Sequence, residues 1–200
     1  MTSTPASKTL RFPTNRPKSG PLNSAKVTNM AEYADPENTL VIETTKGRVV
    51  IEMRPDLAPG HVDHIKKLAR EGAYDGVVFH RVIDGFMAQT GDVKFGNSTT
   101  ADFNPSRAGT GGSQYPNLKQ EFSAEPHVRG TASMARAQDP NSANSQFFIC
   151  FGDARFLDRQ YTVWGKVSEG MDIVDQIKRG EPVLNPDHMV SVKVAADITE

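Results

Sequence analysis

The chain has 200 residues, of which 37% are hydrophobic and 24% charged, and its formal net charge is −1. This length and composition suit one globular domain with a hydrophobic core. The near-zero charge excludes a general attraction to nucleic acid or anionic lipid, and no apolar run approaches the roughly 18 residues that a membrane helix needs. We therefore predict a soluble protein without nucleic-acid or membrane partners.

The first 37 residues differ in composition from the rest of the chain. They are rich in Ser, Thr, Pro and Asn, and they contain no acidic residue before Glu32. No apolar segment follows the basic residues, which argues against a secretory signal, and several prolines interrupt the amphipathic helix of an organellar transit peptide. A targeting role is the alternative, but the composition favours a disordered extension over residues 1–37 and a folded domain over residues 38–200.

A β-hairpin and a helix are expected at the start of the domain. Residues 40–42, residues 49–51 and Met53 are apolar and flank the turn Thr45-Lys46-Gly47, which predicts the hairpin. Pro59 then opens a segment with apolar residues at helical spacing, and Gly72 closes it. This spacing is typical of an amphipathic helix with one buried face.

His61 and His64 lie one helical turn apart in this segment. Two histidines at this spacing can share a metal ion, but no further ligand or catalytic glutamate stands at a known distance from them. We expect them on a solvated helix face and predict no metal site. The Gly-rich run at residues 109–112 lacks the Gly-Lys-Ser/Thr of a phosphate loop, and no Gly-x-Ser-x-Gly motif is present. We therefore predict no cofactor.

A second hairpin is predicted by residues 77–83 and 86–90, which flank an Asp-Gly turn. Strand alternation would place Phe79 and Arg81 on one face and His80 on the other. An arginine would thus lie on a largely apolar face. This segment alone supports a structural ion pair and a functional role equally.

The rest of the domain is predicted to contain mostly short strands and turns. A second helix fits residues 171–178, and strands fit residues 131–136, 146–151, 161–167 and 190–198. The Gly- and Pro-rich residues 96–117 form a long surface loop, a kind of segment that often carries function. Cys150 is the only cysteine and lies in an apolar run, which fits a buried side chain in a reducing cytoplasm. This order of elements favours a closed antiparallel barrel capped by helices.

Two of these segments in combination resemble the cyclophilins. They are residues 79–87, with the sequence Phe-His-Arg-Val-Ile-Asp-Gly-Phe-Met, and residues 145–149, with the sequence Ser-Gln-Phe-Phe-Ile. The resemblance extends from about Leu40 to Ile198. It implies an eight-stranded antiparallel β-barrel capped by two α-helices, and a peptidyl-prolyl cis/trans isomerase domain over residues 38–200.

The resemblance also implies the roles of individual residues. Arg81 corresponds to the catalytic arginine of the family. The walls of the proline pocket correspond to Phe86, Met87, Phe148 and Leu157. The edge that grips the peptide corresponds to Gln89, Gln146 and the backbone at Ala135, Arg136 and Ala137. Neighbours of the groove are His80 and Gly109, and the positions where many members have Trp and His are occupied by Phe156 and Tyr161.

Some positions depart from the eukaryotic pattern and resemble the bacterial cytoplasmic members. Phe156 lacks the indole donor of tryptophan, so the resemblance implies only weak binding of cyclosporin. The expected partners are proline-containing peptides and unfolded or folding polypeptides, bound by a monomer. A non-catalytic chaperone or scaffold module that binds proline peptides is the alternative. The role of an insertion near residues 97–107 is not predicted.

Overall fold

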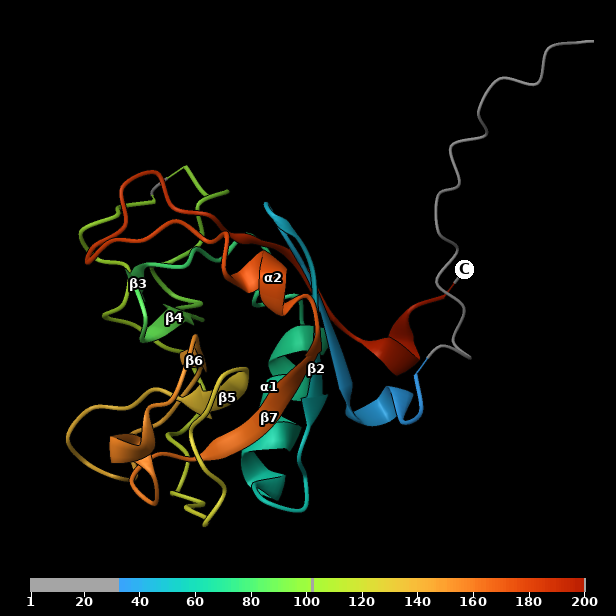
Figure 1. Ribbon diagram of the computed structural model, residues 1–200. Coiled ribbons are helices and arrows are strands. Elements are labelled where there is room, and N and C mark those ends of the chain that lie inside the picture. The colour runs from blue at the N-terminus through green and yellow to red at the C-terminus, as the bar shows by residue number, and fades with distance from the viewer. Residues whose placement is uncertain (1–32, 102, 200) are drawn as a thin grey trace, which may run out of the picture.

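The part of the chain that the structure describes contains eight β-strands and two α-helices, in the order expected from the sequence (Figure 1). The computed structural model describes residues 33–101 and 103–199. The helices are α1 (Pro59–Arg70) and α2 (Met171–Val174). The strands are β1 (Thr39–Thr44), β2 (Gly47–Met53), β3 (Arg81–Ile83), β4 (Met87–Thr90), β5 (Thr131–Met134), β6 (Phe147–Cys150), β7 (Val163–Glu169) and β8 (Met189–Val194). None of the helices in the described ranges is long and apolar enough to span a bilayer.

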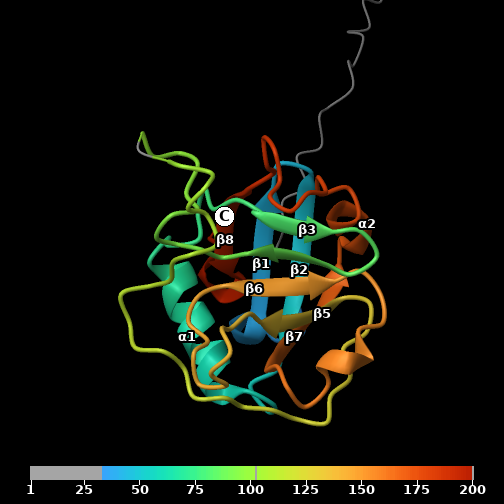
Figure 2. The ribbon, with the colours of Figure 1, turned by 90° about the vertical axis from the view of Figure 1, so that its left-hand side faces the viewer.

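The strands form one antiparallel sheet in the order β3-β4-β6-β5-β7-β2-β1-β8. The sheet curls on itself, so that β3, β4, β6 and β5 lie across and in front of β1 and β2 in Figure 2. The edge strands β3 and β8 are not joined by a regular ladder. One isolated bridge pairs Val78 with His188, directly before β8, and another pairs Val82 of β3 with Gly180, in the segment after α2. The eight-stranded antiparallel sheet is therefore confirmed, whereas a continuous closed barrel is not.

The main hydrophobic core lies inside the curl. Helix α1 packs against it through Val62, Ile65 and Leu68, which are buried. Removing side chains of this size from water stabilises the fold by about 1.5–3 kcal/mol each. Helix α2 is one turn long, shorter than the predicted 171–178. The α-helical bonding ends at Asp175, whose N–H donates to Met171 O. Gln176 and Ile177 then donate to the carbonyls three residues earlier, at 3.0 and 3.1 Å, and Lys178 N donates to the Asp187 carboxylate, 2.9 Å away.

Two of the predictions about side-chain placement are wrong, the first for two histidines of α1 and the second for Phe79. His61 and His64 are buried, because the segment around Tyr115 and Glu121 covers that end of α1. The Glu121 carboxylate accepts the backbone N–H groups of Gly60 and His61 and contacts His61 Nδ1 at 2.5 Å. No group of three or more His, Cys, Asp or Glu side chains in the described parts of the chain is placed to hold a metal ion.

The second wrong position is that of Phe79, which lies in the main core with Val82 and not on the face of Arg81. Regular strand pairing begins only at Arg81. Before it, the backbone bonds to loops, with Val78 N donating to Gly96 O and Phe79 N donating to Asp187 O, both at 2.9 Å. The alternation of a regular strand therefore does not extend back to Phe79.

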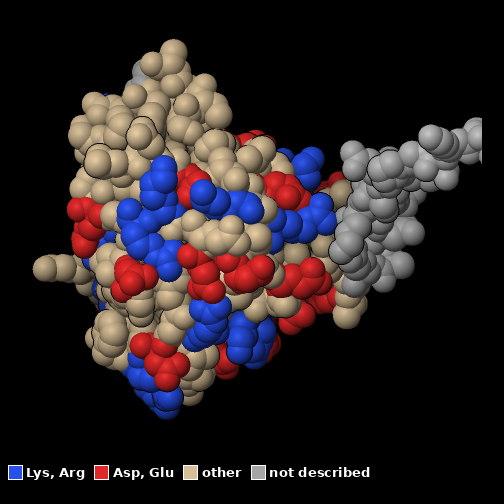
Figure 3. Space-filling view, turned by 45° about the horizontal axis from the view of Figure 1, so that its top comes forward, with Lys and Arg blue, Asp and Glu red and all other residues tan. Residues whose placement is uncertain are grey.

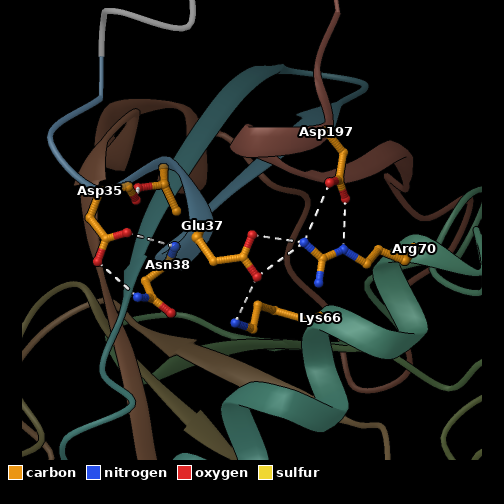
Figure 4. A network of polar contacts seen from close by, with 7 residues as sticks. Asp35, Glu37, Asn38, Lys66, Arg70 and Asp197 are labelled. Atoms are coloured by element: carbon orange, nitrogen blue, oxygen red, sulfur yellow. Dashed lines mark hydrogen bonds and ion pairs between the residues drawn. The ribbon is translucent and has the colours of Figure 1, made fainter.

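A network of ion pairs joins the two ends of the described chain to α1 (Figure 4). Arg70 contacts Glu37 at 2.9 Å and Asp197 at 2.8 Å, and Lys66 contacts Glu37 at 3.1 Å. A 3-10 turn at Pro36–Asn38 is held by the Asp35 carboxylate. Most of the predicted extension 1–37 lies outside the described residues, but its last residues are part of this network.

We predict that the free energy of unfolding falls as the pH drops below about 6.5, the usual pKa of histidine. Burial lowers the pKa of His61, His64, His80 and His127. Below pH 6.5 the unfolded chain therefore binds more protons than the folded chain. The contribution of these neutral histidines to the free energy of unfolding is fully present above pH 6.5, and it is lost as the pH falls toward their lowered pKa values. Urea unfolding at pH 7.5 and 5.5 measures the effect. The midpoint should be lower at pH 5.5, and His64→Gln should reduce the difference; equal midpoints would contradict the prediction.

Candidate active site

The register of three strands sets one row of side chains on the outer face of the sheet. Arg81 of β3 lies opposite Gln89 of β4, and Gln89 lies opposite Phe148 of β6. Directly opposed residues of antiparallel strands point to the same face, so these three side chains are neighbours. Met87 and Phe148 belong to a small apolar cluster on this outer face, separate from the main core.

A cavity of about 400 Å³ opens over this row. Its apolar part is formed by Phe86, Met87, Phe148 and Leu157, with Tyr161 edge-on to Phe148 at 6.0 Å between ring centroids. The guanidinium of Arg81 lines the same cavity. An apolar slot and an arginine thus line one cavity, at residues to which the family resemblance assigns these roles.

Behind Phe148, the His127 ring supports the apolar wall. The two rings are stacked with their centroids 6.2 Å apart. His127 Nδ1 lies 3.1 Å from the Asp158 carboxylate, and Nε2 lies 2.8 Å from Ser133 Oγ. The neighbouring Arg155 guanidinium lowers the pKa of Asp158 to about 2, so this carboxylate is ionised at neutral pH. The ring behind the slot is therefore fixed at both of its nitrogens.

A line of polar contacts crosses the floor of the site. Arg81 Nη1 donates to Gln89 Oε1 at 3.4 Å, and Gln89 Nε2 donates to Gln146 Oε1 at 3.1 Å. Gln146 Nε2 in turn donates to the carbonyls of Gly109 and Gly111, at 3.0 and 2.7 Å. At its other end, Arg81 Nε contacts a Glu181 oxygen at 2.7 Å. Arg81 therefore both forms an ion pair and lines the cavity, so the two roles considered from the sequence do not exclude each other.

The loop that carries Gly109 is held by a buried carboxylate. Asp92 is fully buried and accepts four backbone N–H groups at 2.8–3.0 Å, from Lys94, Phe95, Gly109 and Gly111. Gly109 has a φ of +97° and lies against His80, whose ring would be 2.7 Å from an added Cβ. Only glycine fits there without strain. Part of the predicted long loop is thus fixed at the edge of the cavity.

Most of the predicted site residues line this cavity: His80, Arg81, Phe86, Met87, Gln89, Gly109, Ala135, Arg136, Phe148, Leu157 and Tyr161. Ala137 and Gln146 line an adjoining cavity of about 530 Å³, whose charged lining residues are Lys94 and Arg136. Phe156 lines neither. It is 67% exposed and packs against Phe86 at the rim, with 5.5 Å between the ring centroids.

Sequence reasoning missed four residues that line the first cavity: Ala108, Thr110, Glu181 and Pro182. The first two belong to the long loop, which the sequence singles out only as a whole. The other two reach the site through the isolated bridge between Val82 and Gly180. A bridge of one residue pair leaves no periodic pattern in the sequence, so no signal could have placed them.

Comparisons with known proteins agree with this geometry. Residues 39–195 match the model of the family described as cyclophilin type peptidyl-prolyl cis-trans isomerase. A Brucella suis protein named probable peptidyl-prolyl cis-trans isomerase is 61% identical over 172 residues, which cover 84% of this chain and 87% of the relative. A Helicobacter pylori peptidyl-prolyl cis-trans isomerase is 40% identical over 144 residues, which cover 70% of this chain and 80% of the relative.

Solved structures show the same fold. A cyclophilin from Hirschia baltica has a TM-score of 0.71 and 32% identity, over 82% of this chain and 76% of that one. A cyclophilin-type isomerase from Cryptosporidium parvum has a TM-score of 0.67 and 23% identity, over 78% of this chain and 98% of that one. The chain therefore belongs to the cyclophilin-type peptidyl-prolyl cis-trans isomerase family. Its activity is the isomerisation of X-Pro peptide bonds, as the resemblance implies.

We predict that Asp92→Ala raises the KM for a proline peptide about tenfold, with a smaller effect on kcat. The substitution leaves four backbone N–H groups without their acceptor, and each such hydrogen bond is worth about 1 kcal/mol. The edge of the cavity at Gly109 should then lose its fixed position. Steady-state isomerase kinetics measure this, with circular dichroism to verify folding.

The matched control is Asp84→Ala, which removes an exposed carboxylate that contacts Arg179 outside the cavity. The control should behave as the unsubstituted protein. A KM that stays unchanged in a folded Asp92→Ala variant would contradict the role of the carboxylate.

Proposed function

We propose that the protein binds an extended, proline-containing segment across the cavity and that Arg81 catalyses rotation of its X-Pro bond. The single observation that carries the proposal is that the Arg81 guanidinium and the apolar side chains Phe86, Met87, Phe148 and Leu157 line one cavity. The Cryptosporidium parvum relative was crystallised in the presence of the dipeptide Ala-Pro, which supports the same class of ligand here.

The chemistry requires no metal, nucleotide or covalent intermediate. Resonance in the peptide bond sets a barrier of about 18–20 kcal/mol, and X-Pro isomerisation accordingly takes tens to hundreds of seconds. A guanidinium that donates to the prolyl nitrogen favours the pyramidal nitrogen and so weakens this resonance. An acceleration on the order of 10⁵ corresponds to roughly 7 kcal/mol. A charge-assisted hydrogen bond in a cavity that excludes water supplies energy of this size.

The other predicted site residues bind the peptide or support the residues that bind it. The proline ring packs in the slot of Phe86, Met87, Phe148 and Leu157, with Tyr161 beside it. The flanking peptide lies along the polar edge formed by Gln89, Gln146 and the backbone at Ala135, Arg136 and Ala137. His80 and Gly109 support that edge, and Phe156 extends the apolar rim through its contact with Phe86. The bridges at Val78 and Val82 support treating the sheet as a closed barrel around the main core.

The natural partners that we propose are unfolded and folding polypeptides, which expose proline segments, and the protein acts on them as a monomer. Cys150 is buried and unpaired, which fits a reducing cytoplasm. On the face shown in Figure 3, a band of Lys and Arg side chains lies directly beside a band of Asp and Glu side chains, so neighbouring acidic groups offset the basic charge on this face. A purely non-catalytic chaperone or scaffold is disfavoured, because the arginine and the apolar slot are both present.

Arg81→Ala should keep the fold and lower kcat/KM by about 10²-fold or more, since it removes the donor to the prolyl nitrogen. A protease-coupled assay on a short proline peptide measures the loss. The control is Arg129→Ala, which removes an exposed arginine paired with Asp175 away from the cavity. Full turnover in a folded Arg81→Ala variant would refute the catalytic role.

Cyclosporin should inhibit the protein weakly, because Phe156 has no donor where many relatives carry a tryptophan N–H. Phe156→Trp restores the indole and should tighten inhibition about tenfold or more without changing peptide turnover. Inhibition constants for the two proteins, measured in the same assay, test this. Tight inhibition of the unsubstituted protein would overturn the expectation.

A further inference from the structure

Glu181 reaches the cavity from a part of the chain far from the strands that form it. It is the only acidic side chain among the described residues that line the cavity, where the charged groups are Arg81, Arg136 and Glu181. Its Oε1 lies 2.7 Å from Arg81 Nε, although the two residues are 100 positions apart in sequence. Both side chains are partly exposed, at 40% for Arg81 and 57% for Glu181.

The backbone holds Glu181 opposite Arg81. Val82 and Gly180 exchange two hydrogen bonds of 2.8 Å, and Val183 N donates to His80 O at 3.2 Å. The segment on either side of Glu181 is thus bonded to the residues on either side of Arg81. A Cβ at position 180 would approach Pro182 O to 2.7 Å and Val183 Cα to 2.8 Å, so this close turn requires glycine. The ion pair follows from backbone bonding and not from the chance meeting of two long side chains.

The contact determines how the guanidinium presents its donors. The group is planar and carries its five N–H bonds in a fixed arrangement. Glu181 occupies Nε, and Gln89 lies 3.4 Å from Nη1. Nη2 makes no hydrogen bond or ion pair with another described residue. With Nε held from one side and Nη1 from the other, the plane of the guanidinium is fixed and Nη2 remains available to a ligand.

We propose that Glu181 is a positioning residue for the isomerisation: it holds Arg81 so that the free edge of the guanidinium faces the bound X-Pro bond. The inference rests on the proposed catalytic role of Arg81. Glu181 acts on the reaction through that arginine alone. Because the pair is exposed, its effect lies in the orientation of the donor and not in the stability of the fold.

The test compares four proteins in the protease-coupled assay: the unsubstituted chain, Glu181→Ala, Arg81→Ala and the double variant. Glu181→Ala should lower kcat about fivefold, which corresponds to about 1 kcal/mol, and leave KM nearly unchanged. In the Arg81→Ala background the same substitution should have no further effect, because the group that it orients is gone. Glu181→Gln, whose amide oxygen can still accept from Nε, should recover most of the activity.

A second readout does not depend on activity. The Nε–H signal of Arg81 in an NMR spectrum, identified by its absence from Arg81→Ala, should shift or broaden in Glu181→Ala and remain sharp in Glu181→Gln. The matched control is Glu43→Ala, which breaks an exposed ion pair between Glu43 of β1 and Arg48 of β2 and should change neither kcat nor this signal.

The outcomes separate the inference from the proposed function. If Arg81→Ala is fully active, the catalytic role of Arg81 fails and the positioning role fails with it. If Arg81→Ala is inactive while Glu181→Ala retains full kcat and an unchanged Nε–H signal, only the positioning role is overturned. An equal loss from Glu181→Ala in both backgrounds would also overturn it, because that result describes a residue that acts independently of Arg81.

Discussion

The site depends on the hydrogen-bond register of β3, β4 and β6. This register sets Arg81, Gln89 and Phe148 side by side on the outer face, while the alternate residues of β4 and β6 fill the main core. A slip of one residue would turn every one of these side chains to the other face. The core therefore fixes the register through its apolar side chains, and the register in turn fixes the donor beside the apolar slot. The stability of the core and the arrangement of the candidate site therefore depend on the same ladder of backbone bonds.

The outer face would be a flat surface without the segments that surround it. The Asp92 carboxylate accepts four backbone N–H groups and so holds Gly109 against His80. This loop forms one edge of the cavity. The segment that follows α2 forms another edge of the cavity and contributes Glu181. Both are irregular: the first is held by the buried Asp92 carboxylate, and the second by backbone hydrogen bonds to Val82 and His80. The sheet supplies the floor of the site, and the loops supply its shape.

Features that are local in the chain were predictable, and features that depend on distant contacts were not. Both hairpins and α1 could be read from turn residues and apolar spacing, and the segments at residues 79–87 and 145–149 were specific enough to indicate most of the site. The burial of His61 depends on Glu121, which lies 60 residues away, and the place of Phe79 depends on bonds to two loops. The sequence contains no periodic trace of such contacts. The position of Glu181 in the cavity could not be predicted from the sequence for the same reason.

The ion pairs of Arg70 have a consequence for larger assemblies. They hold the first and last described segments side by side against α1, and Figure 1 shows these segments on the opposite side of the molecule from β3 and β4. The first and last described segments are therefore neighbours, and both lie away from the candidate site. A domain fused to either end, or a tether to a surface, would leave the groove open to incoming polypeptides. The same geometry makes the fold suitable for insertion as a unit into another protein.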